Sequence, residues 1–267
     1  MNRIDRIFSE LRERGDAGLM PFLTGGYPSL EGTEAAIEGL GDAGASVVEI
    51  GFPFSDPIAD GPVIASSMFD ALAAGVTPVR IFEMIERVRD RTDLGLIAMV
   101  SVSIVRKMGV DRFLDRAAEV GFDGLIVPDL DYEDAPEFAQ MAGERGLIVS
   151  MLVAPTTTEE RLEGVVRGCT GFVYVLSRVG VTGESSEMSG GGLSERLAGL
   201  RRLTDLPLAV GFGISTAEQV ARVTEQADAA IVGSALVRNM GDAEDAVGAT
   251  VGFVSRLADG LRRSDQR

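Results

Sequence analysis

The stretch EIGFPFSDPIADGP, residues 49–62, contains the side chains whose chemistry is easiest to name. An apolar pair leads into Glu49, so this carboxyl group stands at the end of a predicted buried strand. A stiff loop with three prolines follows and carries Asp56 and Asp60. An unpaired acid at a crowded, partly dry strand end is costly to ionise, so its pKa rises. A carboxyl group of raised pKa is suited to general acid–base catalysis.

Composition limits the other kinds of chemistry. The sequence has no histidine, which removes His-based acid–base catalysis, Ser-His-Asp triads and most zinc sites. The net charge of −16 argues against nucleic acid and anionic membrane surfaces as partners. No apolar run approaches the length of a membrane span, and no signal peptide is evident. The single cysteine excludes an internal disulfide and fits a reducing cytoplasm.

Short apolar runs alternate with helical patterns along the chain, and 45% of the residues are apolar, which is ample for a core. Eight such units in strict order predict parallel strands closed into an α/β (β/α)8 barrel, or TIM barrel. We expect one domain over residues 1–267, with an extra amphipathic helix at residues 4–14. An open doubly wound sheet is the alternative, but its G-x-G-x-x-G fingerprint is missing. The predicted strands are residues 19–23, 47–50, 96–102, 124–127, 148–153, 171–176, 208–210 and 229–232.

Helix ends have their own signals. Thr77 before Pro78 predicts an N-cap, and Gly121 predicts the end of a later helix. Two further helices are predicted to open with capping boxes, Thr157-x-x-Glu160 and Ser215-x-x-Glu218.

Barrel enzymes place their active sites where the strands end, and the loops after strands seven and eight often bind phosphate. Here Gly211 and Gly213 follow the seventh run, and Gly233-Ser234 follows the eighth and opens a predicted short helix at residues 235–239. Backbone N–H groups at such a helix start attract an anion without any cationic side chain. Ordinary tight turns are the alternative reading of these glycines.

Structural roles also compete for the other candidates. Glu49 can cap a helix or pair with a lysine, and Asp60 on a loop is typical of a solvated turn residue. The place of Asp129 at a strand end, in VPDL, favours a structural role. The place of Tyr174 within a predicted strand favours packing inside the barrel. Cys169, near a helix end, is also typical of a structural residue.

Six segments resemble, in order and with near-family spacing, motifs of the tryptophan synthase alpha subunit family. They are PFLTGGYP at 21–28, VEIGFPFSDPIADGP at 48–62, DGLIVPDL at 123–130, VYVLSRVGVTG at 173–183, GFGIS at 211–215 and VGSA at 232–235. The resemblance implies a (β/α)8 barrel that cleaves indole-3-glycerol phosphate to indole and glyceraldehyde 3-phosphate in the cytoplasm. It implies a pyridoxal-phosphate-dependent beta subunit as partner in an alpha2beta2 heterotetramer, with no cofactor or metal in this chain.

The matching motifs also indicate which residues of this chain would form the site. The resemblance makes Glu49 the acid that shuttles protons at indole C3 and the glycerol hydroxyl, and Asp60 the charged partner of N1–H. Phosphate-binding positions fall on Gly183, Gly213, Gly233 and Ser234. Pocket positions fall on Phe22, Tyr174, Thr182 and Phe212.

The segment 177–192 is too long and too rich in glycine and serine for a plain barrel connection. Such loops are often active-site lids. We expect it to close over the phosphate, to bring Thr182 to the Asp60 loop and to pair Arg178 with an acid such as Asp56.

The chain also departs from the family pattern in ways that bear on the subunit interface and on signalling between subunits. Two alternatives follow, a stand-alone lyase that releases free indole and a catalytically weak regulatory subunit of the beta enzyme. A third, an unrelated phosphate-sugar barrel such as an epimerase, would not need the PFSDPxADGP loop. The departing positions are Ala65, Asp70, Ser101, Ser103 and Asp131.

Overall fold

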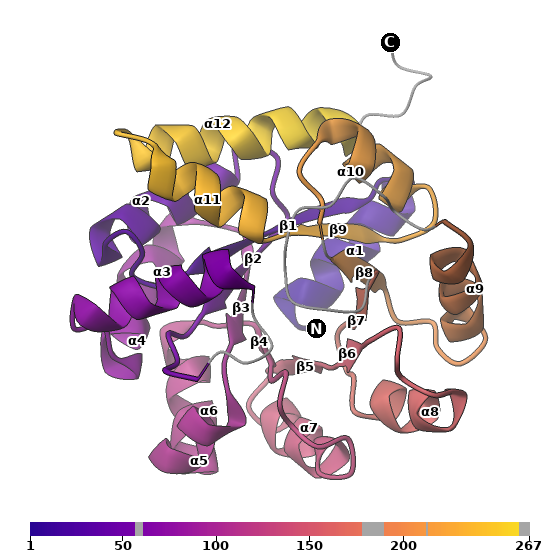
Figure 1. The fold of residues 1–267 in the computed structure, drawn as a ribbon. Helices are drawn as coiled ribbons and strands as arrows, with labels where there is room; N and C mark the ends of the chain where they lie inside the picture. The colour runs from indigo at the N-terminus through magenta and orange to yellow at the C-terminus, as the bar shows by residue number, and fades with distance from the viewer. Residues whose placement is uncertain (57–60, 178–189, 212, 262–267) are drawn as a thin grey trace.

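A ring of parallel strands lies inside a ring of helices (Figure 1). The structure is a computed structural model and describes residues 1–56, 61–177, 190–211 and 213–261. The strands pair in the order β5-β4-β3-β2-β1-β9-β8-β7-β6. Their bounds are β1 Gly18–Thr24, β2 Val47–Gly51, β3 Gly95–Met99, β4 Gly124–Ile126, β5 Ile148–Ser150, β6 Leu152–Val153, β7 Val173–Leu176, β8 Leu208–Gly211 and β9 Ala229–Val232.

The barrel closes through the chain itself. β5 and β6 stand at the two edges of the strand order, yet only Met151 separates them in sequence. β5 pairs with β4, β6 pairs with β7, and Tyr174 N donates to Met151 O at 3.1 Å. The two short strands are therefore halves of the one strand predicted at 148–153. The predicted (β/α)8 barrel is confirmed.

The predicted third strand is too long. β3 ends at Met99, and the prediction of strand through residue 102 is wrong. Ser101 is instead the N-cap of the next helix, and its hydroxyl accepts from Ser103 N at 3.1 Å. Capping by a polar side chain thus starts a helix inside an otherwise apolar run.

The helices cover the outside of the barrel (Figure 1). The predicted amino-terminal helix is confirmed as α1, and the short helix after the eighth run, α11, is longer than predicted. The bounds are α1 Arg3–Arg14, α2 Leu30–Leu40, α3 Pro62–Ala73, α4 Pro78–Val88, η1 Arg89–Arg91, α5 Val102–Met108, α6 Val110–Val120, α7 Ala135–Gly143, α8 Glu159–Arg167, α9 Gly190–Arg201, α10 Ala217–Thr224, α11 Ser234–Asp242, α12 Ala246–Ala258 and η2 Asp259–Leu261.

Two of the predicted helix ends are confirmed and two are displaced. Thr77 caps α4, and Gly121 ends α6 in the left-handed conformation, with φ of 93°. Both predicted capping boxes are wrong by one residue. Thr158 precedes α8 and makes no side-chain cap, whereas Thr216 and Gln219 form the reciprocal pair at α10. A glutamine at the third helical position serves as well as the glutamate that the pattern suggested.

Side chains of each strand alternate between the barrel interior and the helices. On β2, Val48 and Ile50 belong to the apolar layer under the helices, whereas Val47 belongs to the interior cluster. Glu49 therefore points into the barrel. At the amino-terminal end, α1 contributes Ile4 and Phe8 to the interior cluster. This helix closes the bottom of the barrel.

No single helix in the described part of the chain is long and apolar enough to cross a membrane. α3 and α4 together meet the same requirement by length and composition, but they are bent by 95° at their junction.

A cluster of charges stabilises the amino-terminal end of the barrel. Asp123 Oδ2 accepts from Arg89 Nη1 at 3.2 Å and from Leu96 N at 2.8 Å, and Arg3 Nε lies 3.4 Å from Oδ1. The side chains of Arg89 and Asp123 are only 11% and 12% exposed. Burial raises the pKa of Asp123 despite these partners, and burial lowers the pKa of Arg89. Each charge therefore depends on its partner.

Asp123→Ala should destabilise the fold strongly, because the change leaves the Arg89 guanidinium buried without its anion. Loss of one partner of a buried ion pair costs about 3–5 kcal/mol. Urea denaturation measures this loss. Asp16→Ala, which breaks the exposed pair with Arg14, should change the unfolding free energy by less than about 1 kcal/mol. Equal effects of the two substitutions would contradict the assignment.

Candidate active site

Glu49 is buried in the barrel wall. Its exposed fraction is 0%, and neither carboxylate oxygen has a hydrogen-bond partner among the described residues. Burial raises the pKa of Glu49 well above its ordinary value. The prediction that this group stands at the strand end is wrong. Pairing of β2 with β1 and β3 continues through Gly51, two residues further along the chain. The extra two residues place the carboxyl group deeper in the barrel, away from bulk solvent.

Glycines make room for two aromatic rings in the same interior. A Cβ at Gly51 would lie 2.5 Å from Phe22 Cζ, and a Cβ at Gly211 would lie 2.7 Å from the Tyr174 hydroxyl. Both rings therefore lie over bare backbone of the neighbouring strand. β2 and β7 lie on opposite sides of the ring, so Glu49 and Tyr174 point inward from opposite walls. Tyr174 is 7% exposed and belongs to the interior cluster, which agrees with its predicted packing inside the barrel.

The predicted phosphate region lies where β8 and β9 end. Gly213 has φ of 73°, a left-handed conformation that favours glycine. Gly233 is the N-cap residue of α11 and Ser234 is its first residue. The first N–H groups of a helix have no carbonyl partner within it, so the start of α11 can offer backbone donors to an anion. The structure thus brings Gly213, Gly233 and Ser234 to adjacent strand ends.

Five of the predicted site residues lie outside the described residues, and so does the predicted contact of the lid with Asp56. Asp56 itself is exposed, and its carboxylate accepts from the Ser55 hydroxyl at 2.8 Å. The residues outside are Asp60, Arg178, Thr182, Gly183 and Phe212.

Two residues have the structural roles that their positions predicted. Asp129 accepts from the Ser101 hydroxyl at 2.7 Å and from Val102 N at 2.8 Å, so it ties the end of β4 to the start of α5. Cys169 is buried and accepts from Met151 N at 3.3 Å, and burial raises the pKa of its thiol to about 12. The described residues contain no group of three or more His, Cys, Asp or Glu that could hold a metal ion.

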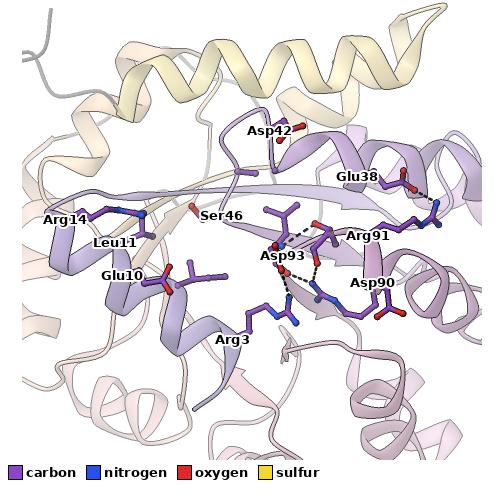
Figure 2. A pocket seen from close by; sticks show the side chains of 16 residues that line it. Arg3, Glu10, Leu11, Arg14, Glu38, Asp42, Ser46, Asp90, Arg91 and Asp93 are labelled. Atoms are coloured by element: carbon purple, nitrogen blue, oxygen red, sulfur yellow. Dashed lines mark hydrogen bonds and ion pairs between the residues drawn. The ribbon is translucent and has the colours of Figure 1, made fainter.

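A groove of about 840 Å³ lies at the other end of the barrel. Figure 2 shows the side chains that line it. It lies between α1, the turn before β2 and the segment before β3. Some of its charged side chains pair with one another, for example Arg91 with Glu38 and Arg3 with Asp93. The groove is thus separate from the carboxyl ends of the strands and does not belong to the candidate site.

Sequence reasoning missed Ser150, a second buried polar group in the interior. Ser150 is 0% exposed, and its hydroxyl has no hydrogen-bond partner among the described residues. The alternation of side chains along β5 could have revealed it, because Ile148 points into the barrel and the residue two positions later shares its face.

A closed parallel barrel with an unpaired carboxyl group in its interior, below glycine-rich strand ends, defines an enzyme of the TIM-barrel class. Comparisons with known proteins specify the family. Residues 8–261 match the family model described as tryptophan synthase alpha chain. This chain belongs to the tryptophan synthase alpha chain family, whose members are lyases of tryptophan biosynthesis that cleave indole-3-glycerol phosphate and work with a beta subunit.

Individual relatives agree over nearly their whole length. The tryptophan synthase alpha chain of Halorhodospira halophila is 42% identical over 262 residues, which are 98% of this chain and 94% of that protein. That of Methanosarcina barkeri is 40% identical and covers 98% of both chains. A structure of Mycobacterium tuberculosis tryptophan synthase superimposes with a TM-score of 0.90 at 33% identity, covering 98% of this chain and 99% of that chain.

Glu49→Gln should make the protein more stable than the parent above about pH 4.5, the ordinary pKa of a glutamate. Below that pH both side chains are neutral. As pH rises, the unfolded parent ionises Glu49 while the folded parent resists, so the parent loses stability until pH passes the raised folded pKa. The difference in free energy of unfolding between Glu49→Gln and the parent grows by about 1.4 kcal/mol per pH unit between the unfolded and folded pKa values of Glu49. Denaturation of both proteins across pH measures it; parallel curves would contradict the burial of an unpaired acid.

Gly211→Ala should impair turnover more than stability, because the new Cβ must displace the Tyr174 hydroxyl from 2.7 Å. The barrel interior around Tyr174 changes shape while the apolar layer under the helices is untouched. The kcat and the melting temperature of the variant measure the two effects. Gly143→Ala on α7, where a Cβ meets nothing within 4 Å, is the matched control and should be silent in both.

Proposed function

We propose that this chain cleaves indole-3-glycerol phosphate with Glu49 as the proton shuttle and Asp60 as the charged partner of indole N1. The observation that carries the proposal is the complete burial of the Glu49 carboxyl group without a partner among the described residues. Its raised pKa favours the protonated form of this carboxyl group. A general acid that must donate its proton early in a reaction needs this state.

The bond between indole C3 and the glycerol chain breaks in a retro-aldol reaction. Glu49 first donates its proton to C3, which leaves positive charge on the N1–H side of the ring. The resulting carboxylate then accepts the proton of the glycerol hydroxyl next to C3. The electron pair of that O–H forms the aldehyde, the carbon–carbon bond breaks, and its electrons restore neutral indole. One carboxyl group therefore gives and regains one proton in each turnover.

Asp60 has the complementary role. An ionised aspartate at N1 balances the positive charge that develops when C3 is protonated. This assignment rests on the motif, because Asp60 lies outside the described residues. Two carboxyl groups with different surroundings then perform separate tasks, and histidine is not needed.

Substrate binding divides between two regions. Phe22 and Tyr174 supply aromatic surface near Glu49 for the indole ring. Gly213, Gly233 and Ser234 offer backbone donors to the phosphate at the start of α11. Motif correspondence adds Thr182, Gly183 and Phe212, and we propose that the lid segment with Arg178 and Asp56 closes over this end.

The beta subunit of tryptophan synthase is the partner of this family. We propose that it receives the indole in an alpha2beta2 assembly in the cytoplasm, that pyridoxal phosphate resides only in the beta subunit, and that residues 1–267 form one domain. The chain itself then needs no cofactor or metal. The departures at Ser101 and Ser103 lie at the start of α5, so they alter the rim of the barrel and leave Glu49 unchanged.

Glu49→Gln should lower kcat by at least roughly 10²–10⁴, the usual value of a positioned acid–base group. Substrate should still bind, because the phosphate region is unchanged. Asp60→Asn should also reduce kcat severely, and Asp60→Glu should keep part of the activity. Single-turnover formation of indole from indole-3-glycerol phosphate, with and without a beta subunit, is the measurement. Glu13→Gln, on the exposed face of α1, is the control; near-parental turnover of Glu49→Gln would refute the mechanism.

A further inference from the structure

Ser150 is a buried hydroxyl that the fold does not explain. The described neighbours supply neither a donor nor an acceptor to its Oγ, and the residue is 0% exposed. Ile148 belongs to the interior cluster and Leu152 packs against it, so Ser150 between them also points into the barrel. Buried hydroxyl groups are nearly always hydrogen-bonded, and an exception needs a reason. Alanine would fill this position without that cost.

The strand register places Ser150 near the level of Glu49. Glu49 is the register partner of Ile97, Ile97 of Gly124, and Gly124 of Ile148. Strands of a TIM barrel tilt by about 36°, which shifts the level by about one residue per strand. After three strands, the level of Glu49 falls about three residues beyond Ile148, next to Ser150. The two side chains therefore point inward at nearly the same height.

The surroundings of Glu49 offer few other polar groups. The inward side chains of β1, β3, β4 and β9 near this level are apolar, as are those of α1 below. Among its described members, the interior cluster contains no charged side chain, and Tyr174 is its one titratable residue. On the side of Ser150, β8 presents Ala209 and Gly211, which are small. On this side the Tyr174 ring covers Gly211, and Ser150 and Tyr174 both contribute a hydroxyl group.

We propose that Ser150 is a positioning residue for Glu49, and that its hydroxyl donates to the Glu49 carboxylate through one internal water at the floor of the indole pocket. A water between two polar groups that do not reach one another directly satisfies both. The bond forms with the ionised state, so it stabilises Glu49 during the part of the cycle when its proton is on the substrate. This role rests on the proposed function of Glu49 and adds a residue to it.

The test is a direct titration of Glu49. Infrared spectra of protein labelled with ¹³C-glutamate contain the carboxyl band of Glu49, which is assigned as the band absent from Glu49→Gln. A hydrogen bond to the charged form lowers a pKa. Ser150→Ala should therefore raise the pKa of Glu49 by about half a pH unit to one pH unit. Ser150→Thr, which retains a hydroxyl, should return the pKa towards the parental value.

Thr250→Val is the matched control, because it also removes a fully buried hydroxyl, but one that donates to Ala246 O on α12 outside the barrel interior. It should leave the titration unchanged. The pH profile of kcat should shift with the infrared pKa in Ser150→Ala and should not shift in the control. An unchanged Glu49 pKa in Ser150→Ala would overturn the proposal. Near-parental turnover of Glu49→Gln would instead refute the catalytic role of Glu49, and the titration would still decide the link to Ser150.

Discussion

Burial of one carboxyl group inside a closed ring of strands is the constraint on which the rest of this structure depends. Ionising Glu49 there is unfavourable, because no described charge offsets the loss of water. The penalty persists only because the parallel barrel is stable enough to hold the side chain in place. Closure through the single strand that contains Met151 leaves no sheet edge that could relax around the charge. The fold thereby shifts this group towards its protonated form, relative to a glutamate in water.

The two ends of the barrel divide stability from chemistry. At the amino-terminal end, α1 fills the opening with apolar side chains, and Asp123 joins Arg3 and Arg89 in a mostly buried ion cluster. Towards the carboxyl end, Gly51 and Gly211 carry no side chain, so the rings of Phe22 and Tyr174 can lie over the strand backbone. A tight end and an open end are what a barrel needs if its loops are to bind a ligand.

The departures from the family pattern have local structural uses in this chain. The Ser101 hydroxyl caps α5 and also donates to Asp129, and the second contact joins two neighbouring βα units at the rim. Such polar caps satisfy backbone groups that a surface helix otherwise leaves to water. The chemistry depends on residues deeper in the barrel, so the rim can vary while Glu49 stays in place.

The sequence by itself determined the elements, and the tertiary structure decided their environments. Apolar runs, the cap at Thr77 and the glycine at Gly121 act within a few residues, so their patterns predicted the strand order and several helix ends. The end of β3 and the cap of α10 were predicted one to three residues away from their true positions. Neighbouring residues are equally good candidates for the cap, so the sequence pattern does not distinguish Ser101 or Gln219 from them. The raised pKa of Glu49 was predictable in direction from its place on a strand, but its depth in the barrel was not. The unsatisfied hydroxyl of Ser150 could not be predicted at all, because whether a polar group has a partner depends on side chains from strands distant in sequence that only the closed barrel brings together.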